Sequence, residues 1–137
     1  MKTSFDIDKI VLDLLRASAV KDVISGGIYF QNDRPDNSNK EDIVINTITM
    51  TQDFLPQIAI SNVNIYVADQ PRRIEKTEQW KPNHKRLSEL TKMVVEVLRG
   101  SRIDGLKLIP ESQSVLQEEG IKQHFCNIRI VWNIQTI

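Results

Sequence analysis

Apolar residues recur every three or four positions in two segments of the chain, which is the pattern of an amphipathic helix packed by one face on a core. In residues 5–18 the stripe contains Ile7, Ile10, Val11, Leu14 and Leu15. In residues 83–99, ahead of Gly100, it contains Leu87, Leu90, Met93, Val94, Val97 and Leu98. Thr3 or Ser4 is placed to cap the first helix, and Asn83 the second. The pattern therefore predicts two main helices.

A second pattern, in which side chains alternate between two faces, predicts long strands at 43–51, 58–68 and 121–134. The first of these strands has two faces, made of Ile43, Ile45, Thr47 and Thr49 on one side and Val44, Asn46, Ile48 and Met50 on the other. The last strand has one face made of His124, Cys126, Ile128, Ile130, Trp132 and Ile134. Strands that are apolar on both faces lie in the middle of a sheet or are covered by a partner.

Shorter elements and two polar connections complete the chain. We predict a helical turn at 19–24 that ends at Gly26 or Gly27, and short strands at 28–30, 105–109 and 113–117. Residues 31–42 and 69–82 are rich in polar side chains and are predicted to be long loops. Loops of this length in a compact domain are often functional.

The order of these elements predicts the fold class. Runs of strands joined by short turns, with only two main helices, are typical of α+β proteins and not of alternating βαβ units. We expect a single mixed or antiparallel β-sheet with two main helices packed on it. Since 137 residues suffice for one core, residues 1–137 are predicted to form a single domain.

The composition narrows the environment and the partners. Eighteen basic and eighteen acidic residues give a formal charge of zero, so no overall field attracts the chain to nucleic acid or to a membrane. Cys126 is the only cysteine, and neither a secretory signal nor an apolar run of membrane-spanning length is found, which favours a reducing cytoplasm. A chain without net charge is also prone to associate.

No pattern of catalytic residues emerges, and we predict neither catalytic nor cofactor-binding residues. No Gly-x-Ser-x-Gly and no glycine-rich phosphate cradle occurs. His124 and Cys126 lie two apart on one strand face, but zinc needs three or four ligands and His84 lies far along the chain. A buried thiol beside a histidine at the strand end is the favoured interpretation, and no metal site is predicted.

The connection at 69–82 has one alternative interpretation. Arg72, Arg73 and Lys76, with Trp80 nearby, have the chemistry to touch phosphates and stack on a base. Acidic residues are interleaved with them, so a solvated loop is favoured. Trp80 either belongs to an interface, where aromatic residues are enriched, or packs on the helix at 83–99.

Taken together, these segments make the chain resemble the tail-terminator, or tail-completion, proteins of long-tailed phages. The resemblance lies in the order and spacing of the helix at 7–15, Val20-Lys21-Asp22-Val23 before Gly26-Gly27-Ile28-Tyr29, Arg34-Pro35, Ile43-Val44-Ile45, the strand at 63–68 and the helix at 87–98. It covers most of the chain, and the C-terminal third offers no diagnostic motif.

The resemblance implies a structural protein of the virion and no enzyme. Its subunits would form a ring, hexameric in that family, which caps the tail tube, meets the head connector and leaves room for DNA to pass without specific contacts. The protein would reside in the host cytoplasm during assembly and then in the tail or neck of the virion. Contacts with neighbours are expected from the two polar connections, and the interface residues predicted there are Arg34, Asp36, Arg72, Arg73 and Trp80.

Three other interpretations remain open. A related head-tail joining or neck protein would have a similar small fold, and fold alone does not fix a position in the virion. A small adaptor domain would stay monomeric or dimeric and use residues 31–42 for recognition. An enzyme ranks last, because no nucleophile, base and orienting group occur together.

Overall fold

A computed structural model describes residues 1–118 and 120–137. Their helices and strands are α1 (Ser4–Arg16), α2 (Val20–Val23), β1 (Ile28–Phe30), β2 (Ile43–Met50), β3 (Gln57–Ala68), β4 (Gln70–Ile74), β5 (Thr77–Lys81), α3 (His84–Gly100), β6 (Leu106–Glu118) and β7 (Gln123–Ile134). Five strands form a sheet in the order β1-β2-β3-β7-β6, and β4 and β5 form a separate two-stranded sheet. The predicted α+β class is confirmed.

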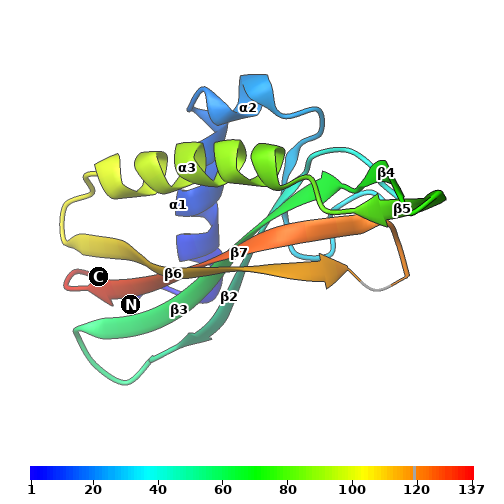
Figure 1. The fold of residues 1–137 in the computed structure, drawn as a ribbon. Helices are drawn as coiled ribbons and strands as arrows, with labels where there is room; N and C mark the ends of the chain where they lie inside the picture. The colour runs from blue at the N-terminus through cyan, green and yellow to red at the C-terminus, as the bar shows by residue number, and fades with distance from the viewer. Residues whose placement is uncertain (119) are drawn as a thin grey trace.

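Both main helices pack on the same face of the five-stranded sheet (Figure 1). Helix α1 contacts β1 and β2, whereas α3 lies across β3, β7 and β6. Only β1 and β2 are parallel, and every other pair of neighbours is antiparallel, so the sheet is mixed as predicted. Apart from Val44, the buried apolar side chains of the described residues form one cluster between the helices and the sheet, and Trp132 is the largest of them.

The two predicted helices are present, with small shifts in their ends and faces. Asn83 caps α3 by accepting a hydrogen bond from the Arg86 amide at 3.1 Å, as predicted. Thr3 is the N-cap of α1 in a reciprocal capping box with Asp6. The prediction that Leu14 faces the core was wrong, because Leu12 is buried in its place and the buried stripe of α1 is shifted.

Two strand predictions were wrong because the register shifts at bulges. In β2 a bulge between Thr47 and Thr49 exchanges the two faces, so Met50 packs against the core, not on the same side as Val44. The strands expected at 105–109 and 113–117 are one strand, β6, which runs through a bulge at 110–112. Pro110 lies at this bulge on an edge strand, where a residue without an N–H is tolerated.

The connection at 69–82 was predicted to be a loop, and this prediction was wrong. It contains the antiparallel hairpin β4–β5, which projects beyond the end of β3 (Figure 1). The two turn residues, Glu75 and Lys76, have φ angles of 49° and 68°. A hairpin turn with two positive φ angles is usually built from Asn and Gly, so the sequence gives no signal for it.

The connection at 31–42 is a loop, as predicted. No helix among the described residues combines the length and the apolar character needed to cross a membrane.

Candidate interaction surfaces

Arg34, one of the predicted interface residues, lies inside the protein's own polar network. Its Nε donates to Oδ2 of Asp42 at 2.8 Å, and its side chain is only 15% exposed. The same carboxylate accepts from the Ser38 hydroxyl at 2.6 Å and from the Gly27 amide at 2.9 Å. Asp42 therefore ties both ends of the connection at 31–42 to the turn before β1.

The same arginine fastens this connection to the helix-free face of the sheet. Its guanidinium lies 4.0 Å from the centre of the Tyr66 ring and donates to Oε1 of Gln123 at 2.9 Å. Tyr66 in turn stacks on Phe125 at 5.0 Å. Arg34 is thus a residue that positions the loop, whereas Asp36, predicted beside it, is exposed at the loop's surface.

The other three predicted residues, Arg72, Arg73 and Trp80, lie together on the β4–β5 hairpin, which we call the arm. Every residue of β4 is exposed, and no residue of β5 is buried. Trp80 is 43% exposed, and Lys122 Nζ lies 4.3 Å from the centre of its ring. The contact that the structure gives for its ring is thus with Lys122, just before β7, and whether Trp80 belongs to an interface stays a prediction.

The arm and the loop at 31–42 meet the same end of β7. Arg34 binds Gln123, and Trp80 lies under Lys122, the preceding residue in the chain. The structure therefore brings the predicted residues to one end of the sheet, although Arg34 is turned inward there. Sequence spacing gave no sign of this, since 89 positions separate Arg34 from Gln123.

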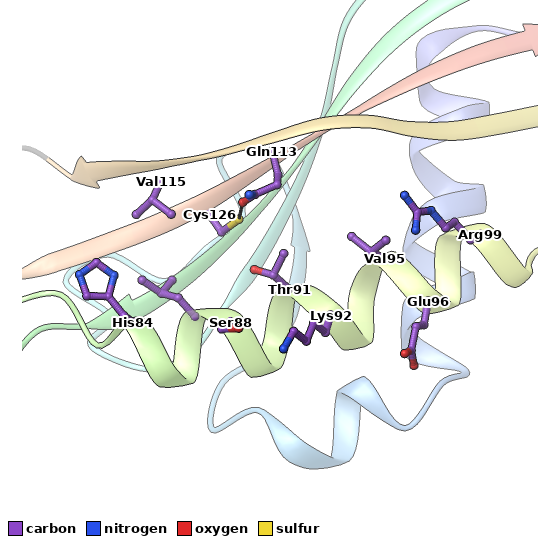
Figure 2. Close-up of a pocket in the computed structure, with 11 residues that line it drawn as sticks. His84, Ser88, Thr91, Lys92, Val95, Glu96, Arg99, Gln113, Val115 and Cys126 are labelled. Carbon is purple, nitrogen blue, oxygen red and sulfur yellow. Dashed lines mark hydrogen bonds between the residues drawn. The ribbon is translucent and has the colours of Figure 1, made fainter.

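A groove of about 550 Å³ runs between α3 and the edge strand β6 (Figure 2). In Figure 2 His84, Ser88, Thr91, Lys92, Val95, Glu96 and Arg99 follow one another along α3. Opposite them, β6 contributes Gln113 and Val115, and Cys126 of β7 lies at the floor. The groove was not predicted, because no local pattern in the sequence shows that Gln113 and Val115 of β6 leave a space beside α3.

Cys126 is the buried thiol that the sequence predicted, with an exposed fraction of 1%. Its Sγ donates to Oε1 of Gln113 at 3.1 Å, and burial raises its pKa above the ordinary thiol value. A protonated thiol is a weak nucleophile, so this environment does not activate Cys126.

His124 and Cys126 face the same side of β7 but have separate partners. His124 Nδ1 lies 2.6 Å from Oδ1 of Asp69, a residue that is 8% exposed. Among residues 1–118 and 120–137, no three His, Cys, Asp or Glu side chains gather with the geometry of a metal site.

A second hollow, of about 590 Å³, lies between the first turn of α1 and the end of β1, and we call it the α1 hollow. It is lined by Ser4, Phe5, Asp8, Lys9, Phe30, Gln31, Asn32, Asp33, Asn46 and Thr47. Phe5 is 82% exposed, the most exposed aromatic side chain of the described residues. This surface was not predicted from the sequence, where its only sign is a large aromatic residue off the apolar stripe of α1.

Asp8 stands at the inner side of this hollow. Its Oδ1 accepts a hydrogen bond from the Thr47 hydroxyl at 2.5 Å, which ties α1 to β2. Partial burial raises the pKa of Asp8, and the bond from Thr47 opposes this rise. Lys9, on the rim, is paired at 2.6 Å with Asp13, so its charge is already balanced.

Neither a known protein family nor a curated protein matches this sequence.

Proposed function

We propose that this protein is a structural component of a long-tailed phage, of the tail-terminator or tail-completion type, and that it acts as a ring of identical subunits. In this proposal the ring caps the tail tube and joins it to the head connector, and DNA passes through its centre. No substrate is transformed, and no cofactor or metal takes part.

The arm is the observation that supports this proposal most. A two-stranded hairpin is at best marginally stable alone in water, and this one contributes no buried residue to the core. It nevertheless presents Trp80 and two arginines to solvent. Aromatic residues and arginine dominate the binding energy of protein interfaces, so such an arm is suited to contact another subunit.

The resemblance on which the proposal rests falls largely on regular elements of the fold. Its segments lie in α1, α2, β1, β2, β3 and α3, apart from Arg34-Pro35 in the connection before β2. The side chains with the most reactive chemistry have structural partners instead of a shared site, since His124 binds Asp69 and Cys126 binds Gln113.

Negative-stain electron microscopy of the purified protein tests the ring. We expect closed rings with a central opening, and we expect light scattering to give a mass of several subunits of 15.8 kDa each. A monomer that persists up to the solubility limit, in the absence and in the presence of tail-tube protein, would contradict the proposal. Binding to the tube protein but not to the connector would favour a terminator over a neck protein.

An adaptor domain is the second candidate, and the groove along α3 favours it. The 13-residue edge strand β6 borders this groove, and within the described part of the chain no strand pairs with its outer side. An extended peptide can add to such an edge as a further strand. In that case the protein would be monomeric by light scattering, and Val115→Arg in the groove would abolish peptide binding.

A further inference from the structure

We infer that the arm of one copy docks in the α1 hollow of the next copy, so that the subunits associate head to tail. This inference deepens the proposed ring and rests on it. It concerns which two surfaces meet, a point that the resemblance leaves undetermined.

The arm cannot reach the α1 hollow of its own chain. The hollow lies beside Asn46, which pairs with Asn62 of β3, whereas the arm begins at Gln70 beyond the end of the same strand. Eight residues of extended chain separate these positions, or about 25 Å at the rise of a β-strand. The arm also points away from α1 (Figure 1). A contact between them must therefore join two molecules.

Charge favours the α1 hollow as the receptor. Residues 70–81 carry four basic side chains against two acidic ones, and no salt bridge of the described residues involves Arg72 or Arg73. The α1 hollow offers the carboxylates of Asp8 and Asp33, while its lysine is paired with Asp13. Complementary charge of this kind selects one orientation of docking and discourages others.

The two other hollows of similar volume have the wrong charge for the arm. The groove along α3 is lined by Lys92 and Arg99 against a single carboxylate, Glu96. A third hollow, of about 540 Å³, follows α3 and is lined by Arg99, Arg102 and Lys107 against Asp104 alone. A basic arm is repelled at both, and this difference in charge sets the α1 hollow apart.

Shape and side-chain chemistry agree with the charges. Pro71, Arg73, Glu78 and Trp80 share one face of the arm, because Pro71 pairs with Trp80 and Arg73 with Glu78. In the α1 hollow, Phe5 and Phe30 provide aromatic surface next to Asp33. We place Trp80 against the two phenylalanines and Arg73 against Asp33. Removing the exposed aromatic area of Phe5 and Trp80 from water would supply most of the affinity.

The two surfaces are different, so their contact is heterologous. A heterologous contact generates a ring if its rotation closes and an open filament if it does not. Each subunit then uses its arm toward one neighbour and its hollow toward the other.

The test begins with two single variants of the full-length protein, Trp80→Ala in the arm and Phe5→Ser in the hollow. Each should weaken self-association about tenfold or more in sedimentation, the effect of losing a central aromatic contact. Both residues are exposed, so the far-UV circular dichroism spectra should match that of the unsubstituted protein, and so should the thermal unfolding curves at a concentration where neither protein associates. Val115→Ser, which removes an exposed apolar residue of the α3 groove, is the control and should leave association unchanged.

Mixing the two variants separates a heterologous from an isologous contact. The Trp80→Ala protein keeps its hollow and the Phe5→Ser protein keeps its arm, so the mixture should give dimers of one copy of each and nothing larger. If the arms paired with each other, the Phe5→Ser protein would associate by itself, and the inference would be overturned.

A charge exchange provides the last experiment of the test. Arg73→Asp and Asp33→Arg should each weaken association. The double variant should restore it, because each contact between subunits then again joins one positive and one negative side chain. Rings that persist in all four single variants would overturn the docking surfaces and leave the proposed ring intact. A wild-type protein that never associates would overturn both. Loss of association only in Val115→Ser would move the contact to the α3 groove and overturn the inference.

Discussion

Arg34 and Asp42 form a largely buried ion pair, with 2.8 Å between Arg34 Nε and Asp42 Oδ2, and this pair holds the long connection before β2 against the sheet. Asp42 is 1% exposed, so water does not replace a lost partner there. The pair also places the loop beside the arm, at the end of the sheet where β7 begins. The ion pair therefore fixes a polar loop next to the arm, which is the surface that we propose for assembly.

Replacing Asp42 with alanine should lower the free energy of unfolding by about 3 kcal/mol or more, because it leaves the Arg34 guanidinium partly buried without a carboxylate. Urea unfolding at neutral pH measures the change. Asp36→Asn is the matched control in the same loop, since Asp36 is exposed, and it should change the free energy by less than about 0.5 kcal/mol. Equal effects of the two substitutions would show that the network does not hold the loop.

The ion pair between Glu41 and Arg86 predicts a pH dependence of stability. Arg86 donates to both oxygens of Glu41, at 2.6 Å and 2.9 Å, and these bonds hold the pKa of Glu41 below its ordinary value of 4.5. Because the folded pKa is lowered, the stabilisation is complete above pH 4.5 and is lost as the pH falls through the folded pKa. The wild-type protein should therefore be more stable than Glu41→Gln at neutral pH, and the difference should shrink below pH 4.5.

Asp8 supplies the control of opposite sign for this experiment. Burial raises its pKa, so its ionisation opposes folding, and protonation as the pH falls favours the folded state. Relative to Asp8→Asn, the wild-type protein should gain stability on acidification. Urea unfolding of the wild-type protein, Glu41→Gln and Asp8→Asn at a series of acidic pH values measures both differences in stability. If the two differences changed in the same direction as the pH fell, the environments assigned to Glu41 and Asp8 would be contradicted.

Some of this fold is readable from local patterns, and α3 shows why. Its apolar stripe, its Asn83 cap and the glycine at its end agree with one another, so the helix was predicted almost to the residue. The central strands were equally clear, because β7 alternates between core and surface from Cys126 to Ile134. Where periodicity, caps and turns agree, local sequence is sufficient.

The missed features depend on contacts that no local pattern encodes. The arm is polar on both faces and turns through Glu75 and Lys76, which lack the usual turn chemistry. The bulge in β2 moved Met50 to the core side, and an alternating pattern does not reveal a shifted register. Arg34 looked like an exposed loop residue, because its partner Gln123 belongs to the far end of the chain.

The two tryptophans should report on different parts of the molecule. Trp132 is fully buried and donates from Nε1 to the Ser61 hydroxyl at 3.0 Å, whereas Trp80 on the arm is 43% exposed. In Trp80→Phe, the remaining fluorescence should be blue-shifted and hardly quenched by acrylamide until the protein unfolds. In Trp132→Phe, it should be red-shifted and readily quenched in the folded protein. Trp80 quenching should fall on self-association if the arm is buried there.

The approach of Gly26 to Asp42 gives the sharpest prediction about the loop. A Cβ at position 26 would lie 1.9 Å from Oδ1 of Asp42 and 2.7 Å from the Glu41 carbonyl oxygen, so Gly26→Ala must displace the carboxylate that binds Arg34. We expect a loss of about 2 kcal/mol or more, at the level of an overpacked core. Gly100→Ala is the matched control, because a Cβ there meets nothing within 4 Å and alanine favours the helix. If the two alanine variants unfolded at the same urea concentration, the contact between Gly26 and Asp42 would not be a constraint on the fold.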